Sequence, residues 1–245
     1  MMKKIIISSV FTFVSLFAYI NVFALNNIYY RNNNSVEFTE EEYNYFYEIY
    51  GIEYIDNMTL EEYDWYSDLN INNNELEVVT YYDIPVSVMD TSHTTASKKI
   101  TITKSCSSAK CTILTTAKWL TNPTIRSYDV IGARFDGVSL YNSNITTRVI
   151  SSSGTSWFSD LKTFPIGFGV SVKLPESSTN IIVEQKFYTT TSGNVYASYQ
   201  HATSNITLAT SKLYTINSSG CGGVFNFYGT ALNKFDRMGG VNINL

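Results

Sequence analysis

The chain has 245 residues, of which 44% are hydrophobic and 15% aromatic, with only 4 Pro and 13 Gly. This composition excludes a disordered or collagen-like protein. Charged residues make up 16%, against about 25% in an average soluble protein, and the net charge is −4. Two His and three Cys leave little room for a zinc cage or an iron–sulfur cluster, and no phosphate-binding glycine loop occurs. We therefore predict neither a metal site nor a cofactor.

Residues 1–24 have the layout of a secretory signal peptide. Lys3 and Lys4 precede a nearly unbroken apolar run over residues 5–20, and residues 22–24 resemble a small-residue cleavage site. The alternative is an uncleaved membrane anchor, but the run is shorter than the ~20 residues that a spanning helix needs. We expect cleavage after Ala24 and a secreted, extracellular protein.

The charges are separated along the chain. Residues 36–90 carry fifteen Asp and Glu and no Lys or Arg, whereas residues 91–245 carry fourteen Lys and Arg against six Asp and Glu. Such asymmetry indicates separate units or an interaction. The acids are either a solvated face that keeps the protein soluble, or a segment that docks on the basic domain and covers a surface for anionic polymer or lipid. No specific nucleic-acid motif is present.

Residues 25–75 are predicted to form an acidic helical hairpin. Thr39 with Glu42, and Thr59 with Glu62, have the spacing of capping boxes that begin helices. Gly51 follows the first helix as a C-cap. Aromatic side chains recur at helical spacing and are expected to pack rather than to bind a ligand: Tyr43, Phe46, Tyr47 and Tyr50.

Residues 76–245 change to a period of two and are predicted to form an antiparallel β-sandwich, which makes the chain mainly β. Turn clusters separate the strand-like runs, and no helical pattern lies between them. The predicted strands cover residues 99–105, 112–120, 127–135, 164–174, 181–188, 195–202, 224–228 and 241–245.

Cys106 and Cys111 are predicted to form a disulfide. A four-residue hairpin loop over residues 107–110 would pair the two cysteines across the strands, with both sulfurs on one face. Two reduced thiols are the alternative, and export favours oxidation. Cys221 is left over in a Gly-rich turn, as a nucleophile or, more simply, as a small residue in a tight loop.

No catalytic residue is predicted. His93 lies in a Ser/Thr-rich linker and His201 on the face of a predicted strand, and neither has a catalytic motif around it. The acids of the basic domain are dispersed: Asp129, Asp136, Asp160, Glu176, Glu184 and Asp236.

Four short motifs stand out along the mature chain: Phe38-Thr39-x-Glu41-Glu42-Tyr43, Met58-Thr59-x-x-Glu62-Tyr63-Asp64, Tyr199-Gln200-His201-Ala202 and Phe235-Asp236-x-Met238-x-Gly240-Val241. Together they resemble segments of exported proteins of Gram-positive bacteria that have no assigned function. The resemblance implies an extracellular address and a type of host, and it implies no activity.

Three functions fit these observations. The first is a cell-envelope binding module whose basic sandwich contacts an anionic polymer or lipid. The second is a degradative hydrolase on a β scaffold, which requires convergent polar groups and a perturbed titratable residue. The third is a β-pore former that uses the Ser/Thr-rich hairpin of residues 101–116. We favour them in that order.

Overall fold

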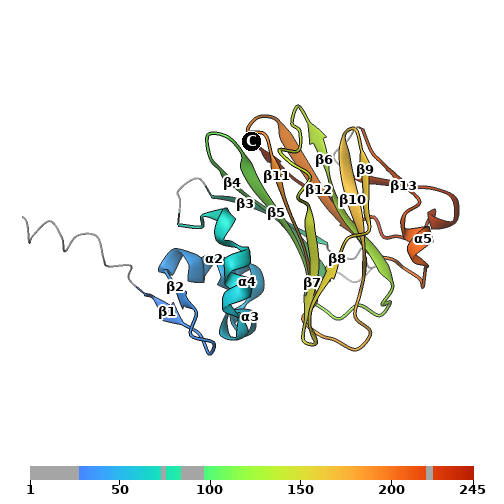
Figure 1. The fold of residues 1–245 in the computed structure, drawn as a ribbon. Coiled ribbons are helices and arrows are strands. Elements are labelled where there is room, and N and C mark those ends of the chain that lie inside the picture. Colours follow the sequence, from blue (N-terminus) through green and yellow to red (C-terminus); the bar gives the residue numbers. More distant parts are fainter. Residues whose placement is uncertain (1–27, 73–75, 84–96, 219–222) are drawn as a thin grey trace, which may run out of the picture. The chain divides into compact units, whose positions relative to one another are not determined.

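The computed structural model describes residues 28–72, 76–83, 97–218 and 223–245 (Figure 1). The expected signal peptide, His93 and Cys221 lie outside these ranges. The chain divides into two compact units, Met1–Tyr63 and Asp64–Leu245, so that the second unit starts ahead of the boundary expected at residue 76. Within the described ranges, no helix has the length and apolar character needed to cross a membrane.

The first unit combines a small two-stranded ribbon with short helices. Their bounds are β1 (Tyr30–Arg31), β2 (Glu37–Phe38), α2 (Glu40–Tyr50), α3 (Ile52–Asn57) and the start of α4 (Leu60–Trp65). Both capping boxes form as predicted. The amide of Glu42 donates to the Thr39 hydroxyl at 3.2 Å, and the amide of Thr39 donates to the Glu42 carboxylate at 2.9 Å. Thr59 and Glu62 repeat both bonds at the same distances.

Two features of this unit differ from a simple two-helix hairpin. Helix α3 intervenes between the two capping boxes, and the Asn32 amide, in the ribbon, donates to the carbonyls of Ile55 and Met58, each at 2.7 Å. The aromatic stripe is only partly buried, because Phe46 is inaccessible while Tyr47 is 53% exposed. The capping chemistry is thus local and predictable, whereas the additional helix depends on a distant side chain.

The second unit is an antiparallel β-sandwich, which confirms the predicted fold class (Figure 1). One sheet has the order β3-β4-β5-β11-β7-β8, with bounds Glu77–Asp83, Lys98–Cys106, Cys111–Trp119, Ile182–Thr189, Thr146–Ser151 and Gly154–Phe158. The other has the order β15-β12-β6-β10-β9, with bounds Val241–Asn244, Asn194–Gln200, Tyr128–Asp136, Gly167–Lys173 and Leu161–Phe164. Every pair of neighbouring strands is antiparallel.

The main core lies between the two sheets and consists of alternate residues from both. Phe168, Val170 and Val172 of β10 point into it, as their period of two predicts. The run 164–174 is nevertheless two strands rather than one, because the chain turns at residues 165 and 166. Phe164 therefore lies in β9, directly opposite Gly167 of β10.

A third layer covers part of the outer face of the five-stranded sheet. It contains α5 (Leu208–Ser211), β13 (Tyr214–Ile216), β14 (Phe225–Phe227) and the short helix η2 (Gly229–Ala231). A Cβ added at Gly169 would lie 2.6 Å from the Tyr214 hydroxyl and 2.8 Å from the Phe225 ring. Gly132, opposite Gly169 on β6, would likewise place a Cβ 2.9 Å from Phe225. The two glycines allow these aromatic rings to lie directly on the sheet.

Candidate functional site

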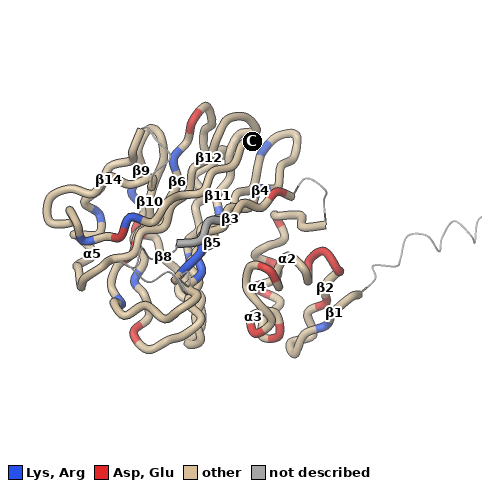
Figure 2. Tube along the Cα trace, turned by 180° about the vertical axis from the view of Figure 1, so that it is seen from behind, with Lys and Arg blue, Asp and Glu red and all other residues tan. Residues whose placement is uncertain are grey.

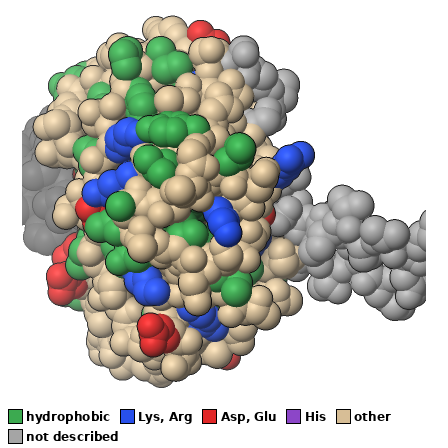
Figure 3. Space-filling view, turned by 90° about the vertical axis from the view of Figure 1, so that its right-hand side faces the viewer, with side chains coloured by type: hydrophobic (Ala, Val, Ile, Leu, Met, Phe, Trp, Pro, Cys, Tyr) green, Lys and Arg blue, Asp and Glu red, His purple; other side chains and the backbone are tan. Residues whose placement is uncertain are grey.

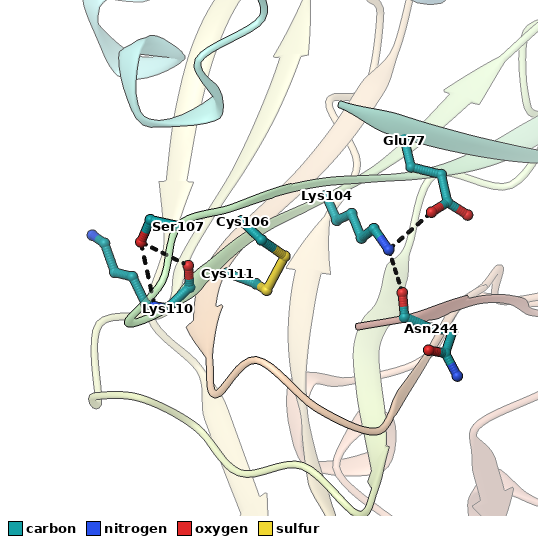
Figure 4. The surroundings of a disulfide bond; sticks show 7 residues. All are labelled: Glu77, Lys104, Cys106, Ser107, Lys110, Cys111 and Asn244. Carbon is teal, nitrogen blue, oxygen red and sulfur yellow. Dashed lines mark hydrogen bonds and ion pairs between the residues drawn. A yellow bond between two sulfur atoms is a disulfide. The ribbon is translucent and has the colours of Figure 1, made fainter. Parts of the chain in front are cut away.

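The predicted hairpin between β4 and β5 has the expected register and contains the disulfide (Figure 4). Cys106 lies opposite Cys111, and the two sulfurs are bonded. The loop closes through the amide of Ser107, which donates to the carbonyl of Lys110 at 2.8 Å. Nearby, the Lys104 ammonium donates to the carbonyl of Asn244 and pairs with a carboxylate of β3, so that the end of this hairpin is tied to β15.

We predict a modest contribution of this disulfide to stability. The bond closes a loop of only a few residues, so replacing both cysteines (Cys106→Ser with Cys111→Ser) should lower the free energy of unfolding by about 2 kcal/mol. Urea unfolding of the two proteins measures the difference, and the reduced wild type is the matched control. An unchanged unfolding midpoint in both comparisons would contradict the prediction.

A cluster of buried and half-buried polar side chains lies where several strands end at one end of the sandwich. Its members come from the start of β4, the end of β5, the start of β6, the end of β12 and the irregular segment before β15: Lys98, Trp119, Asp129, Tyr199, His201 and Asp236. No spacing in the sequence predicts this cluster, because the strands that supply it are distant along the chain and meet only through the sheet topology.

Asp129 is the centre of one half of this cluster. Its carboxylate is inaccessible and accepts from the Ala202 amide at 2.9 Å, from the Tyr199 hydroxyl, and from His201 Nδ1 at 3.0 Å. Tyr199 in turn accepts a hydrogen bond from Trp119 Nε1 at 3.0 Å. Burial raises the pKa of Tyr199 well above its usual value, so the phenol keeps the proton that it donates. His201, for which the sequence suggested no partner, is held by a carboxylate.

Lys98 and Asp236 form the other half. The Lys98 side chain is 2% exposed, and its Nζ contacts Oδ2 of Asp236. The other carboxylate oxygen, Oδ1, accepts from the backbone amide of His201 at 3.1 Å. The rings of Trp119 and Tyr199 lie with their centroids 5.3 and 5.9 Å from Lys98 Nζ. Burial raises the pKa of Asp236, and the positive charge of Lys98 opposes this shift.

A second buried ion pair lies on the outer side of the six-stranded sheet. Arg148 of β7 donates through Nε to Glu184 of β11 at 2.7 Å, and the Tyr66 hydroxyl donates to the same carboxylate at 3.0 Å. The Trp65 ring lies over the guanidinium, with its centroid 3.7 Å from the Arg148 Cζ atom. These contacts hold the segment with Trp65 and Tyr66, which continues into the short helix η1 (Ser67–Leu69), against its own sheet. We therefore assign this pair a structural role.

Cationic side chains lie on aromatic rings along the outer side of the five-stranded sheet. Three strand-borne pairs share this face: Arg134 over Tyr196, Lys162 over Phe164, and Lys173 over Tyr128. The distances from cation to ring centroid are 3.9, 5.1 and 5.5 Å, which is the range of cation–π attraction. The pairing of rings with cations fixes the positions of these charges, of which Arg134 is buried and Lys162 and Lys173 are half-buried.

The third layer adds further basic and apolar groups beside these pairs. Lys234 is exposed, Tyr228 is 46% exposed and Leu232 is 59% exposed. Lys212 pairs with Asp160 at 2.7 Å, and both of these side chains are partly accessible. Figure 3 shows this side of the molecule, with Lys and Arg side chains set among hydrophobic ones. We call this surface, formed by the outer side of the five-stranded sheet and its third layer, the basic aromatic face.

The remaining sequence hypotheses can be placed on the fold. The strands β4 and β5, proposed as a pore-forming hairpin, are paired on both sides, with β3 and β11, inside the six-stranded sheet. Acidic residues are concentrated on the helices α2, α3 and α4, and most basic residues lie in the part of the chain that forms the sandwich (Figure 2). In the part of the chain that the structure describes, no group of three or more His, Cys, Asp or Glu is arranged to hold a metal ion.

No protein-family model and no curated protein matches the chain. Among solved structures, it is similar to the collagen-binding subdomain ACE19 of the Enterococcus faecalis surface protein ACE, with a TM-score of 0.30, 10% identity, and coverage of 39% of this chain and 77% of that one. It is also similar to the KRT10-binding region domain of the pneumococcal serine-rich repeat protein PsrP, with a TM-score of 0.31, 10% identity, and coverage of 51% of this chain and 87% of that one. A third similar structure concerns the pH-induced modulation of Streptococcus parasanguinis adhesion by Fap1 fimbriae. Its TM-score is 0.32, with 13% identity and coverage of 69% of this chain and 94% of that one. Similarity at this level identifies neither a common family nor a shared ligand.

Proposed function

We propose that the chain is an exported binding module of the bacterial cell envelope, and that the basic aromatic face binds an anionic polymer. The observation that carries this proposal is the row of cation–aromatic pairs on the outer side of the five-stranded sheet, Arg134 with Tyr196, Lys162 with Phe164 and Lys173 with Tyr128. Fixed cations attract phosphate or carboxylate groups, and nearby rings pack against the apolar parts of a repeating unit.

Export is supported by two independent features. The first 24 residues have the pattern of a signal peptide, and a disulfide joins Cys106 to Cys111. Disulfides persist in oxidising compartments outside the cytosol. An exported protein with a positively charged face meets the anionic polymers of the envelope, and the charges of the face suit such a ligand.

The test is binding of the mature protein to a poly(glycerol phosphate) chain over a series of salt concentrations. Replacing two surface lysines of the face, Lys212→Gln with Lys234→Gln, should weaken binding roughly ten-fold or more at low salt, since each such lysine contributes about 1 kcal/mol near an anionic surface. Rising salt should weaken binding by the wild type steeply, because the contacts are between exposed charges.

The matched control carries the same change of charge away from the face, Lys104→Gln with Lys110→Gln. These lysines belong to the β4–β5 hairpin of the other sheet, and the control should bind as the wild type does. Equal loss of affinity in both double variants would show a response to net charge only and would contradict the proposal. Binding to phosphatidylglycerol vesicles but not to the polymer would identify a lipid ligand and also contradict it.

The hydrolase hypothesis gains less from the structure. The cluster around Asp129 contains a histidine held by a carboxylate and an acid with a raised pKa. However, Asp129 is inaccessible, Lys98 is 2% exposed and the His201 side chain is 12% exposed. Groups buried to this degree face one another rather than an external substrate, so the chemistry that they favour is within the chain.

A further inference from the structure

We propose that the side chains of Lys98 and Asp236 condense into an intramolecular amide bond. The two groups meet in the buried cluster described above, where Lys98 Nζ contacts Asp236 Oδ2. Lys98 begins β4 in one sheet, and Asp236 lies in the irregular segment that precedes β15 of the other sheet, 138 residues away. The bond would therefore join the two sheets of the sandwich covalently.

Burial of Lys98 beside the half-buried carboxylate of Asp236 provides the driving force. The Lys98 side chain is 2% exposed. Removing an ammonium or a carboxylate from water costs several kcal/mol for each ion, so a buried lysine needs compensating interactions. Condensation replaces both ions with one neutral amide. Folding also places the amine against the carboxyl group of Asp236, which converts an encounter between distant residues into a reaction within one site.

The surroundings of the pair favour the protonated carboxyl of Asp236. The rings of Trp119 and Tyr199 line the Lys98 amine, with centroids 5.3 and 5.9 Å from Nζ. Burial raises the pKa of Asp236, which favours its protonated carboxyl. Proton transfer from the ammonium to the carboxylate gives an uncharged amine beside an uncharged acid, and this is the nucleophile and electrophile that amide formation needs.

The two oxygens of Asp236 have different partners, and the difference assigns their roles. Oδ1 accepts from the backbone amide of His201 at 3.1 Å, so this donor polarises the carbonyl and stabilises the negative charge that develops on it. Oδ2 contacts Lys98 Nζ and is the leaving oxygen. His201 is itself fixed through Nδ1, 3.0 Å from the carboxylate of Asp129, so Asp129 is a positioning residue.

The step balances without a further reactant. The Lys98 ammonium transfers one proton to Oδ2, and its amine attacks Cγ of Asp236 to form the C–N bond. Collapse of the tetrahedral intermediate transfers a second proton from nitrogen to Oδ2, which leaves as water while the Cγ–Oδ2 bond breaks. Oδ1 remains as the amide oxygen and keeps its bond from His201, and the third proton stays on the amide nitrogen.

Intact mass of the purified mature protein, measured after reduction of the disulfide, tests the proposal directly. We expect a mass lower than that of the sequence by one water, and a branched peptide after proteolysis that contains both Lys98 and Asp236. A mass equal to that of the sequence, with no water lost, would overturn the proposal. Loss of water located at Asp136 and Gly137, where an Asp-Gly succinimide can form, would overturn it as well.

Variants separate the covalent bond from a merely structural ion pair. Lys98→Arg keeps a cation beside Asp236 but supplies no amine that can form this amide, so we expect the full mass and slower migration on a denaturing gel. The double variant Lys98→Met with Asp236→Leu removes both charges, preserves folding if the single changes do not, and should also have the full mass. A missing water in either variant would refute the assignment.

Discussion

Replacing Asp129 by alanine should lower the free energy of unfolding by about 3 kcal/mol or more, because three donors lose a buried acceptor at once. The Tyr199 hydroxyl, the Ala202 amide and His201 Nδ1 all donate to this inaccessible carboxylate. Each buried donor that is left without a partner costs about 1 to 3 kcal/mol. Urea unfolding, followed by tryptophan fluorescence because Trp119 contacts the cluster, measures the loss.

The comparison is cleanest in the background Lys98→Met with Asp236→Leu, where no amide can hold the unfolded chain together. Asp129→Asn in the same background is the matched control, because an amide of the same shape retains one acceptor oxygen. It should destabilise the protein by less than Asp129→Ala does. An Asp129→Ala variant as stable as its background would show that water replaces the carboxylate, contrary to our prediction.

The fold class could be predicted because it depends on local patterns. The alternation of Phe168, Val170 and Val172 specifies one buried face of a strand, and the capping box of Thr39 and Glu42 specifies where a helix begins. The Cys106–Cys111 register follows from a single assumption about loop length. Each of these inferences uses residues within a few positions of one another, where backbone geometry alone sets the contacts.

The buried cluster could not be predicted, because its members become neighbours only through the sheet order. Lys98 and Asp236 are 138 residues apart, and Tyr199 and Asp129 are 70 apart. The sequence placed His201 on a strand over residues 195–202, but β12 ends at Gln200 and His201 follows it directly. Its acidic partner, Asp129, belongs to β6, and no spacing or motif in the sequence links the two residues. One signal was present in the sequence. Lys98 has the same parity as Ile100 and Ile102, which point into the core, so its side chain is expected on the inner face of the sheet.

The third layer was missed for a related reason. The run 164–174 alternates without interruption. Nothing in its pattern separates the residues of the main core from Phe164, which packs outside that core against Tyr214 and Phe225 of the third layer. The informative residues were the glycines. A glycine at an outward-facing position of a strand leaves room for something to approach the sheet, and Gly132 and Gly169 face each other across β6 and β10.

Filling that space should therefore remove the third layer from the sheet. We expect Gly169→Val to lower the free energy of unfolding by about 3 kcal/mol, because even a Cβ would lie 2.6 Å from the Tyr214 hydroxyl and 2.8 Å from the Phe225 ring. Chemical unfolding measures the loss, and near-ultraviolet circular dichroism reports the displaced aromatic rings. Thr163→Val, at an exposed position of the adjacent strand β9, is the matched control and should change stability by less than about 0.5 kcal/mol.

A double-mutant cycle identifies the group that Gly169 accommodates. Among the described residues, the buried Tyr214 hydroxyl has no hydrogen-bond partner, so Tyr214→Phe alone should be neutral or slightly stabilising. The same change also removes the atom closest to a new Cβ, and Gly169→Ala should cost less in the Tyr214→Phe background than in the wild type. Strictly additive effects would mean that the ring of Tyr214 does not rest on this strand. Coupling would show that Gly169 makes room for the Tyr214 ring, and so for the layer that carries Tyr228, Leu232 and Lys234 on the basic aromatic face.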